Sequence, residues 1–213
     1  MKSMEHLSLG EMKNLGEINP ILANFAARLL VKTYDEFIEI LYKDIDDVIS
    51  RIQENPELRQ NDSEDRITID IVNQLHFMGY NASHDGKIGG HTDISVKKSN
   101  FLWIGEAKIY YNYGWLWKGF LQLVTRYSTG DSTQKDGGIL VYIKVPNTKK
   151  IMENWKEFLL EKNLSEYSEK TCHLKDLSFF SQHTHEKSGM LFQIRHMPVM
   201  LYFNPQDNVK KSK

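Results

Sequence analysis

Two acidic residues and a lysine stand where the chain could place them around one ion. Glu106 and Lys108 are two residues apart in a β-prone run, so on a strand their side chains project from the same face. Asp93 lies on an earlier β-rich run, and the polar segment 97–100 between the two runs is typical of a hairpin turn with its flanks. The chemistry of this set is that of a carboxylate site for a divalent cation beside an amine.

The register of the hairpin decides whether the two acids meet. With Ser99-Asn100 as a two-residue turn, facing residues have numbers that sum to 199. Asp93 then faces Glu106, and like charges in facing positions, with Cβ atoms about 4.5–5.5 Å apart, repel each other. A divalent cation held by oxygen ligands would offset this repulsion, with Lys108 beside it.

An Asp followed by Glu-x-Lys on a hairpin resembles the PD-(D/E)XK nuclease superfamily, the restriction-endonuclease-like fold. The resemblance covers roughly residues 61–145, and Thr92 stands where the family's proline would precede the Asp. It implies an α/β (α+β mixed) fold with a central mixed sheet flanked by helices. The residues that match the pattern are Asp93, Glu106, Ala107 and Lys108.

The resemblance also implies a reaction, the hydrolysis of DNA phosphodiester bonds with Mg²⁺ or Mn²⁺. The metal would be held by Asp93, Glu106 and the carbonyl of Ala107, and would stabilise the charge that builds on phosphate oxygens during in-line attack by water. Lys108 would orient the water, lower its pKa or pair with the scissile phosphate. These three roles remain open.

An acidic helix start precedes the hairpin. Residues 61–65 combine N-cap residues with first-turn acids, and apolar residues from Ile67 to Met78 recur at helical spacing. In the resembled family a helix in this position often adds an acidic metal ligand, which would be Glu64. An acid that interacts only with the helix dipole explains the same residue.

A second helix, predicted over residues 115–128, follows the Glu-Ala-Lys strand. A spacing of four places Gln122 and Arg126 on one face. In the resembled family a helix here often presents a Gln towards the active site, as Gln122 would. Some branches add a Tyr four residues later, where this chain has Arg126, a candidate phosphate ligand, with Tyr127 one residue further on.

Other residues near the cluster have two interpretations each. His91 would share the face of Asp93 on a strand, where it could contact substrate or a metal-bound water, or it could be a plain surface residue. The aromatic residues between positions 110 and 117 could stack on unpaired bases, although packing against the core is the commoner use. Cys172 is interpreted as a buried, inert thiol rather than a nucleophile.

Composition narrows the class of protein. Hydrophobic residues make up 40% and charged residues 26% of the 213 residues, which is ordinary for a globular protein. A single cysteine excludes an internal disulfide and, with no signal-peptide core at the N-terminus, favours a cytoplasmic location. No apolar run approaches the roughly 20 residues that a membrane span needs, so we expect no membrane partner.

We expect three regions: an N-terminal helical extension (1–60), a nuclease-like core (61–205) and a flexible tail (206–213). The first has 7 Lys/Arg and 11 Asp/Glu, a net charge of −4, which leaves +3 for the rest. DNA would therefore meet a local basic surface outside the extension. The apolar stripe predicted for residues 20–53 packs on the core, or binds a second protomer or a protein partner.

The remaining elements complete the expectation. We predict strands over 80–87 and 139–145, a helix over 148–162, and strand-like runs over 190–203 that break at Pro198. The function that fits best is a metal-dependent DNA endonuclease or exonuclease, used in restriction, defence or repair. The alternatives are a catalytically silent nuclease-like module that binds nucleic acid or protein, and an unrelated protein with a coincidental Glu-Ala-Lys.

Overall fold

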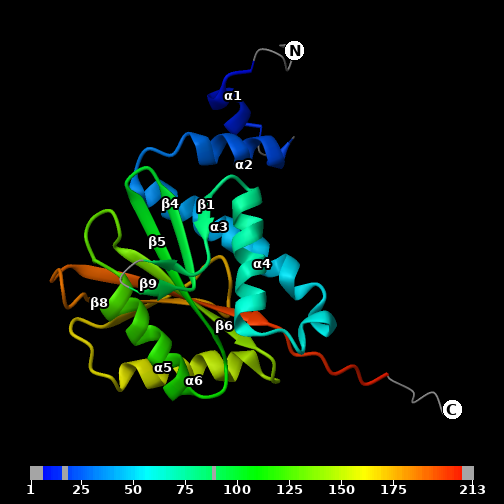
Figure 1. The fold of residues 1–213 in the computed structure, drawn as a ribbon, viewed down its shortest axis with the longest axis vertical. Helices are drawn as coiled ribbons and strands as arrows, with labels where there is room; N and C mark the ends of the chain where they lie inside the picture. Colours follow the sequence, from blue (N-terminus) through cyan, green and yellow to red (C-terminus); the bar gives the residue numbers. More distant parts are fainter. Residues whose placement is uncertain (1–6, 16–18, 88–89, 208–213) are drawn as a thin grey trace.

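A seven-stranded mixed β-sheet forms the centre of the molecule (Figure 1). The computed structural model describes residues 7–15, 19–87 and 90–207. Neighbouring strands are antiparallel except for the pairs β5–β6 and β6–β9, which are parallel. The strands in spatial order are β1 (Asn81–Ser83), β4 (Ile94–Lys98), β5 (Phe101–Ile109), β6 (Asp136–Ile143), β9 (Leu191–Met200), β8 (Phe179–Thr184) and β7 (Ser168–Thr171). The expected mixed α/β class with a central mixed sheet flanked by helices is confirmed.

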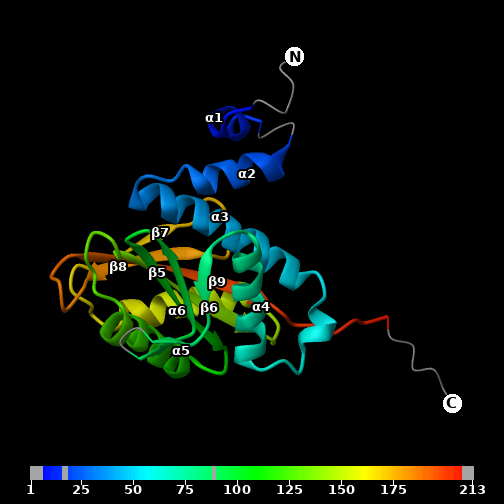
Figure 2. The ribbon, with the colours of Figure 1, turned by 45° about the horizontal axis from the view of Figure 1, so that its top comes forward.

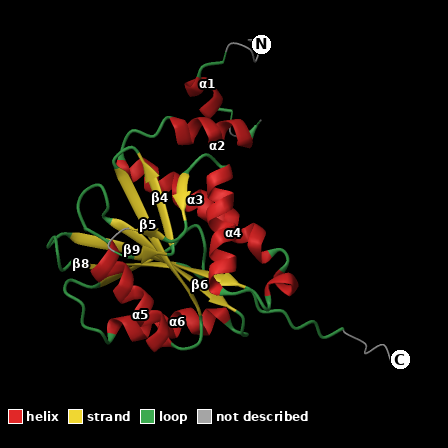
Figure 3. Ribbon diagram, in the orientation of Figure 1, coloured by secondary structure: helices red, strands yellow, loops and turns green. Residues whose placement is uncertain are grey.

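Helices cover both faces of the sheet, as Figures 2 and 3 show. One core contains buried residues of α3 (Tyr34–Gln53) and α4 (Glu64–Phe77). The other contains residues of α5 (Tyr113–Leu121), the π-helical turn η3 (Gln122–Tyr127) and α6 (Thr148–Leu160). The strand β6 serves both cores, because alternate side chains of a strand point to opposite faces. Leu140 and Tyr142 lie in the first core, and Ile139, Val141 and Ile143 in the second.

Over residues 20–53, where the apolar spacing fits one long helix or a pair of helices, the structure forms a pair. The N-terminal segment forms α1 (Leu9–Lys13), α2 (Pro20–Leu29) and α3, and the short 3-10 helix η2 (Pro56–Arg59) follows. The second helix ends because Thr33 starts a new one: its side chain accepts a hydrogen bond from the Glu36 N–H, and the Glu36 carboxylate accepts one from the Thr33 N–H. The buried face of α3 belongs to the sheet's own core, which agrees with packing on the core rather than with a free arm.

The predicted hairpin register is confirmed. Ile94 pairs with Gly105 and Lys98 with Phe101, and Ser99 turns the chain with a φ of 53°. The structure differs at one position, since Asp93 is a bend between β4 and the small strand β3 (His91–Thr92) and is not itself paired in the ladder.

Two other expectations need correction. The strand expected over 80–87 is divided into β1 and β2 (Gly86–Lys87), because Asp85 adopts a left-handed φ of 56° and turns the chain. The strand β9 continues through Pro198, which pairs with Val141. The neighbouring strand β8 pairs with β9 only as far as His196, so Pro198 lies where one edge of the strand is open and a missing N–H is tolerated.

Two expectations concern the ends and the surroundings of the chain. Most of the expected tail, residues 208–213, lies outside the described residues. Among the helices that the structure describes, none is long and apolar enough to cross a lipid bilayer.

Candidate functional site

Lys108 stands at the centre of three carboxylates. Its Nζ lies 2.7 Å from Glu106 Oε1, 3.2 Å from Glu64 Oε1 and 3.4 Å from Asp93 Oδ2. It also donates a hydrogen bond of 3.0 Å to the carbonyl of Ala107. The structure thus brings together four side chains that the sequence analysis singled out, and we refer to Glu64, Asp93, Glu106 and Lys108 as the carboxylate–lysine cluster.

The cluster forms where the edge of β5 loses its neighbouring strand. The ladder between β4 and β5 ends at Gly105, so the backbone N–H groups beyond it need other acceptors. Asp93 Oδ2 accepts from the Ala107 N–H at 2.8 Å, and Glu64 Oε2 accepts from the Ile109 N–H at 2.7 Å. These two bonds fix the acids against the same strand that carries the Glu-Ala-Lys motif.

The start of α4 positions Glu64 in turn. Ser63 caps this helix by accepting a hydrogen bond from the Arg66 N–H, which makes Glu64 the first helical residue. The helix then runs along the first core with Ile67 and Ile71 buried. Glu64 therefore reaches the cluster because the packed helix directs its N-terminus at β5.

The cluster holds more negative than positive charge. Three carboxylates surround one ammonium, and Glu106 is only 1% exposed and Lys108 6%. Within the described chain, Glu106 Oε2 has no hydrogen-bond partner. A buried carboxylate oxygen without a partner is costly in its ionised form, so this group either takes up a proton or requires a further cation.

Burial and the excess of acids together shift the pKa values of the cluster. Burial, and then the neighbouring Asp93 carboxylate, raise the pKa of Glu106 to about 8 despite the ammonium of Lys108. Burial also raises the pKa of Glu64, against the opposing effect of Lys108. For Lys108, burial lowers the pKa, but the carboxylates of Glu106, Asp93 and Glu64 outweigh it and hold the pKa above its ordinary value. The lysine is therefore a cation in this arrangement.

The helix α5 covers the cluster closely at Gly119. A Cβ atom there would lie 2.9 Å from Lys108 Cγ and 3.3 Å from Glu106 Cγ. A glycine at this position lets the helix backbone press on the stems of both side chains, which excludes water from the inner side of the cluster.

A hollow of about 510 Å³ opens beside Lys108. Gln122 and Arg126 both line it, so the face of the second helix that the sequence analysis predicted is turned towards the site. Gln122 is half-buried and Arg126 is exposed. A ligand bound at Lys108 would therefore be within reach of both side chains.

Tyr127, five residues after Gln122, belongs to the same region. The turn that carries it is π-helical, with the Ser128 N–H donating to the carbonyl of Leu123 at 3.1 Å. Because a π-helical turn takes one residue more than an α-helical turn, Tyr127 follows Gln122 by one turn, as a residue four positions later would in an α-helix. In the sequence, the only sign of this π-helical turn was that the tyrosine follows Gln122 by five residues instead of four.

The ring of Tyr127 is buried close to the cluster. Burial raises its pKa, and the carboxylates of Glu106 and Asp93 raise it further. Gly90, which has a φ of 147°, packs against it, and a Cβ there would lie 2.9 Å from Tyr127 Cε1. The backbone that precedes Asp93 therefore packs against the ring of Tyr127.

His91 is placed apart from the cluster. It lies on β3, which pairs with β2 in a separate two-stranded sheet, and its Nδ1 is 2.5 Å from Asp85 Oδ1. Its side chain is mostly exposed. The bend at Asp93 turns the preceding residues away from the face that a continuous strand would have given them.

The donor set of the cluster suits a hard divalent cation, but the acids are not arranged as a ready-made site. In the described part of the chain, no group of three or more His, Cys, Asp or Glu side chains is positioned to hold a metal ion. The Nζ of Lys108 stands among the carboxylate oxygens instead. Carboxylate and carbonyl oxygens are the ligands that Mg²⁺ and Mn²⁺ prefer, and the unpartnered Glu106 Oε2 fits such a ligand. Binding requires Lys108 to withdraw.

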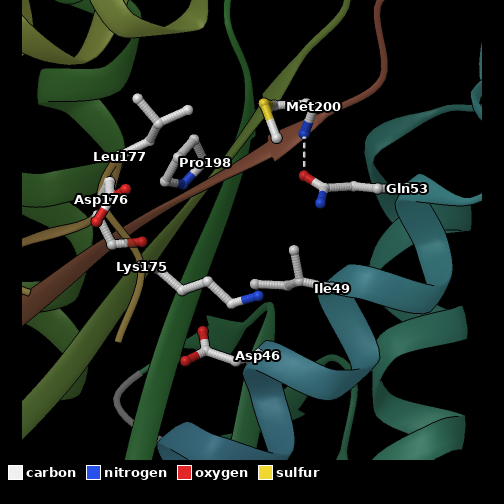
Figure 4. A pocket seen from close by; sticks show the side chains of 9 residues that line it. Asp46, Ile49, Gln53, Lys175, Asp176, Leu177, Pro198 and Met200 are labelled. Carbon is white, nitrogen blue, oxygen red and sulfur yellow. Dashed lines mark hydrogen bonds between the residues drawn. The ribbon is translucent and has the colours of Figure 1, made fainter. Parts of the chain in front are cut away.

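A second hollow, of about 200 Å³, lies away from the cluster between α3 and β9 (Figure 4). Its wall includes Asp46, whose Oδ2 already binds Arg195 at 2.9 Å. Gln53 Oε1 accepts a hydrogen bond from the Met200 N–H across it (Figure 4). The side chains of Asp46 and Gln53 are thus engaged with the fold itself.

Comparison with known proteins gives no relative for this chain. No family model, no curated protein and no solved structure matches it. The functional argument therefore depends on the geometry of the cluster and its surroundings.

Proposed function

We propose that the protein is a metal-dependent nuclease that hydrolyses phosphodiester bonds of DNA on a restriction-endonuclease-like core. The single observation that carries this proposal is the convergence of the Glu64, Asp93 and Glu106 carboxylates on Lys108, with more acids than cations. A buried structural ion pair needs one partner for each charge. Three acids around one amine favour a site that takes up further positive charge.

The order of elements supports the same proposal. A helix supplies Glu64, the β4–β5 hairpin supplies the Asp and the Glu-x-Lys, and the following helix and π-helical turn supply Gln122. These are the positions that a member of the PD-(D/E)XK superfamily would use.

Each residue of the site then has a role. Asp93, Glu106 and the carbonyl of Ala107 would hold Mg²⁺ or Mn²⁺, which when bound supplies Lewis-acid stabilisation of the phosphate oxygens and activation of water. Glu64 adds a further ligand or holds Lys108. As a cation, Lys108 binds the scissile phosphate or orients the attacking water, and Arg126 binds a neighbouring phosphate from the exposed side of the hollow.

A second candidate function is favoured by one observation. The ammonium of Lys108 occupies the space between the acids and hydrogen-bonds the carbonyl of Ala107. If that arrangement persists in the presence of divalent cations, the protein is a silent nuclease-like module that binds nucleic acid or a protein partner.

Cleavage of plasmid DNA separates the two functions. Supercoiled and linear DNA are incubated with the wild type in Mg²⁺, in Mn²⁺ and in EDTA, and with the Lys108→Ala variant. We expect cutting that depends on metal and that falls by at least about 100-fold in Lys108→Ala, because a positioned catalytic group typically contributes about 10²–10⁴ in rate.

Lys43→Ala is the matched control, since Lys43 is an exposed lysine on α3 that pairs with Glu39. It should cut as the wild type does. Equal cutting by the wild type and Lys108→Ala would remove the catalytic assignment, and no cutting by any of the proteins would favour the silent module.

A further inference from the structure

The hollow beside Lys108 is lined by cations and no acid. Its charged residues are Lys108, Lys118 and Arg126. Four other hollows in the described chain each include at least one Asp or Glu in their walls. On a protein whose net charge is −1, this hollow is therefore suited to an anion, and its position beside the carboxylate–lysine cluster makes that anion part of the substrate.

The same hollow presents an aromatic face to solvent. Trp115 lines it and is 37% exposed, whereas Trp103 and Trp155 are fully buried. Tyr111 is 68% exposed and meets the Trp115 ring edge-on, with centroids 6.5 Å apart. Lys118 Nζ lies 5.6 Å from the centroid of the Trp115 ring. This ammonium lies over a face of the indole ring, so a base that stacks on that face replaces the long Lys118 side chain, which then pairs with phosphate.

We infer that this hollow binds a single-stranded segment of DNA, with an unpaired base stacked on Trp115 and backbone phosphates held by Lys118 and Arg126. The inference rests on the proposed nuclease function and names its substrate class. Bases in an undistorted duplex are stacked on each other, so an aromatic side chain receives a base face most readily from an unpaired strand. Trp115 and Lys108 line the same hollow, so a base stacked on Trp115 belongs to the strand whose phosphate reaches the cluster.

Stacking in this hollow does not depend on which base is bound. Stacking accepts any base, because every base has a π-face. The hydroxyl of Thr125, which also lines the hollow, already donates to the carbonyl of Leu121 at 2.7 Å. Stacking on Trp115 therefore selects for an unpaired base and not for its identity, and the Gln122 amide is a lining group that could contact a base edge.

Fluorescence polarisation in EDTA tests the inference without cleavage. The probes are a labelled 20-nucleotide oligo(dT) and a labelled 20-base-pair duplex. We expect the wild type to bind oligo(dT) at least about tenfold more tightly than the duplex. Trp115→Ala should weaken oligo(dT) binding about tenfold, within the range measured for loss of one stacked base, and should change duplex binding less than about twofold.

Two further variants make the test specific. Trp115→Phe keeps an aromatic face and should retain most of the affinity for oligo(dT), which separates stacking from a folding defect. Phe77→Ala removes an 86% exposed aromatic side chain on α4, outside the hollow, and should bind as the wild type does. Lys118→Gln should reduce the slope of log affinity against log salt by about 0.7 for oligo(dT).

The outcomes distinguish this inference from the proposed function. Equal affinity of the wild type for both probes, or oligo(dT) binding that is unchanged in Trp115→Ala, overturns the inference even if plasmid DNA is cut. Oligo(dT) binding that depends on Trp115, in a protein that cuts no DNA in Mg²⁺ or Mn²⁺, supports the binding site and overturns the nuclease proposal instead.

Discussion

Two buried charged groups of this protein differ in their balance. Arg195 is fully buried and pairs with one acid, Asp46, at 2.9 Å. Its other contacts are the carbonyl of Tyr42, the thiol of Cys172 at 3.2 Å and the faces of two aromatic rings. In the carboxylate–lysine cluster, one ammonium faces three acids. The first group is neutral as a pair, and the second carries a surplus of negative charge.

The difference separates a structural pair from a site. In the Arg195–Asp46 pair each charge has a partner of opposite sign, although the Nε of Arg195 has no hydrogen-bond partner among the described residues. Asp44 is balanced in the same way, with Arg28 bound to both of its oxygens at 2.7 and 2.8 Å. Cys172 belongs to the structural side as well, since it is a buried thiol against Arg195. The excess of acids in the cluster destabilises the folded state, and a bound cation would offset this destabilisation.

Replacing the cation of each group should give the largest difference in the free energy of unfolding between the two groups. Arg195→Met leaves Asp46 buried and unpaired, and should lower the free energy of unfolding by about 3–5 kcal/mol. Lys108→Met should cost clearly less, because Glu64 and Asp93 remain partly open to water and Glu106 can take up a proton. Urea unfolding near pH 7 in EDTA measures both. A loss in Lys108→Met as large as in Arg195→Met would show that the cluster is an ordinary structural ion pair.

A smaller effect is expected on the pH dependence of stability, which Glu106 in the cluster should dominate. Because the folded pKa of Glu106 is raised to about 8 from an ordinary 4.5, the folded state binds this proton more tightly than the unfolded state. The stabilisation is full below about pH 4.5 and is lost as the pH rises through 8.

In EDTA, the free energy of unfolding should therefore fall between pH 5 and pH 8, by a contribution on the order of 2 kcal/mol that is absent in Glu106→Gln. Chemical unfolding at several pH values measures this difference. Parallel pH profiles for the wild type and Glu106→Gln would contradict the assigned charge surplus.

Sequence reasoning reached the centre of the site because the relevant signals are local. A two-residue turn at Ser99-Asn100 and the period of two along a strand fix which residues of the hairpin face each other. An N-cap before Glu64 fixes the start of a helix. That this helix start meets the hairpin was an expectation from the family resemblance, since the sequence alone does not fix how helix and sheet pack.

The features that were not foreseen depend on tertiary structure. The bend at Asp93 places its carboxylate under the Ala107 N–H, and the need for that bond appears only when the end of the β4–β5 ladder is known. The π-helical turn, which brings Tyr127 into register with Gln122, has no strong sequence signature beyond the spacing itself. The break before α3 was left open between one long helix and a helical pair, and the capping box of Thr33 and Glu36 was the signal that could have decided it.

The uptake of a divalent cation tests the central claim most directly. Thermal unfolding is followed for the wild type, for Glu106→Gln and for Asp136→Asn, which alters a buried carboxylate outside the cluster that accepts a hydrogen bond from Gln193. At a Mn²⁺ concentration 100 times the dissociation constant, binding adds about 2.7 kcal/mol, which raises Tm by about 5–10 °C for a protein of this size. We predict this rise for the wild type and Asp136→Asn and its loss in Glu106→Gln. A Tm that does not change with Mn²⁺ or Mg²⁺, or that rises equally in Glu106→Gln, would contradict a cation site at the cluster.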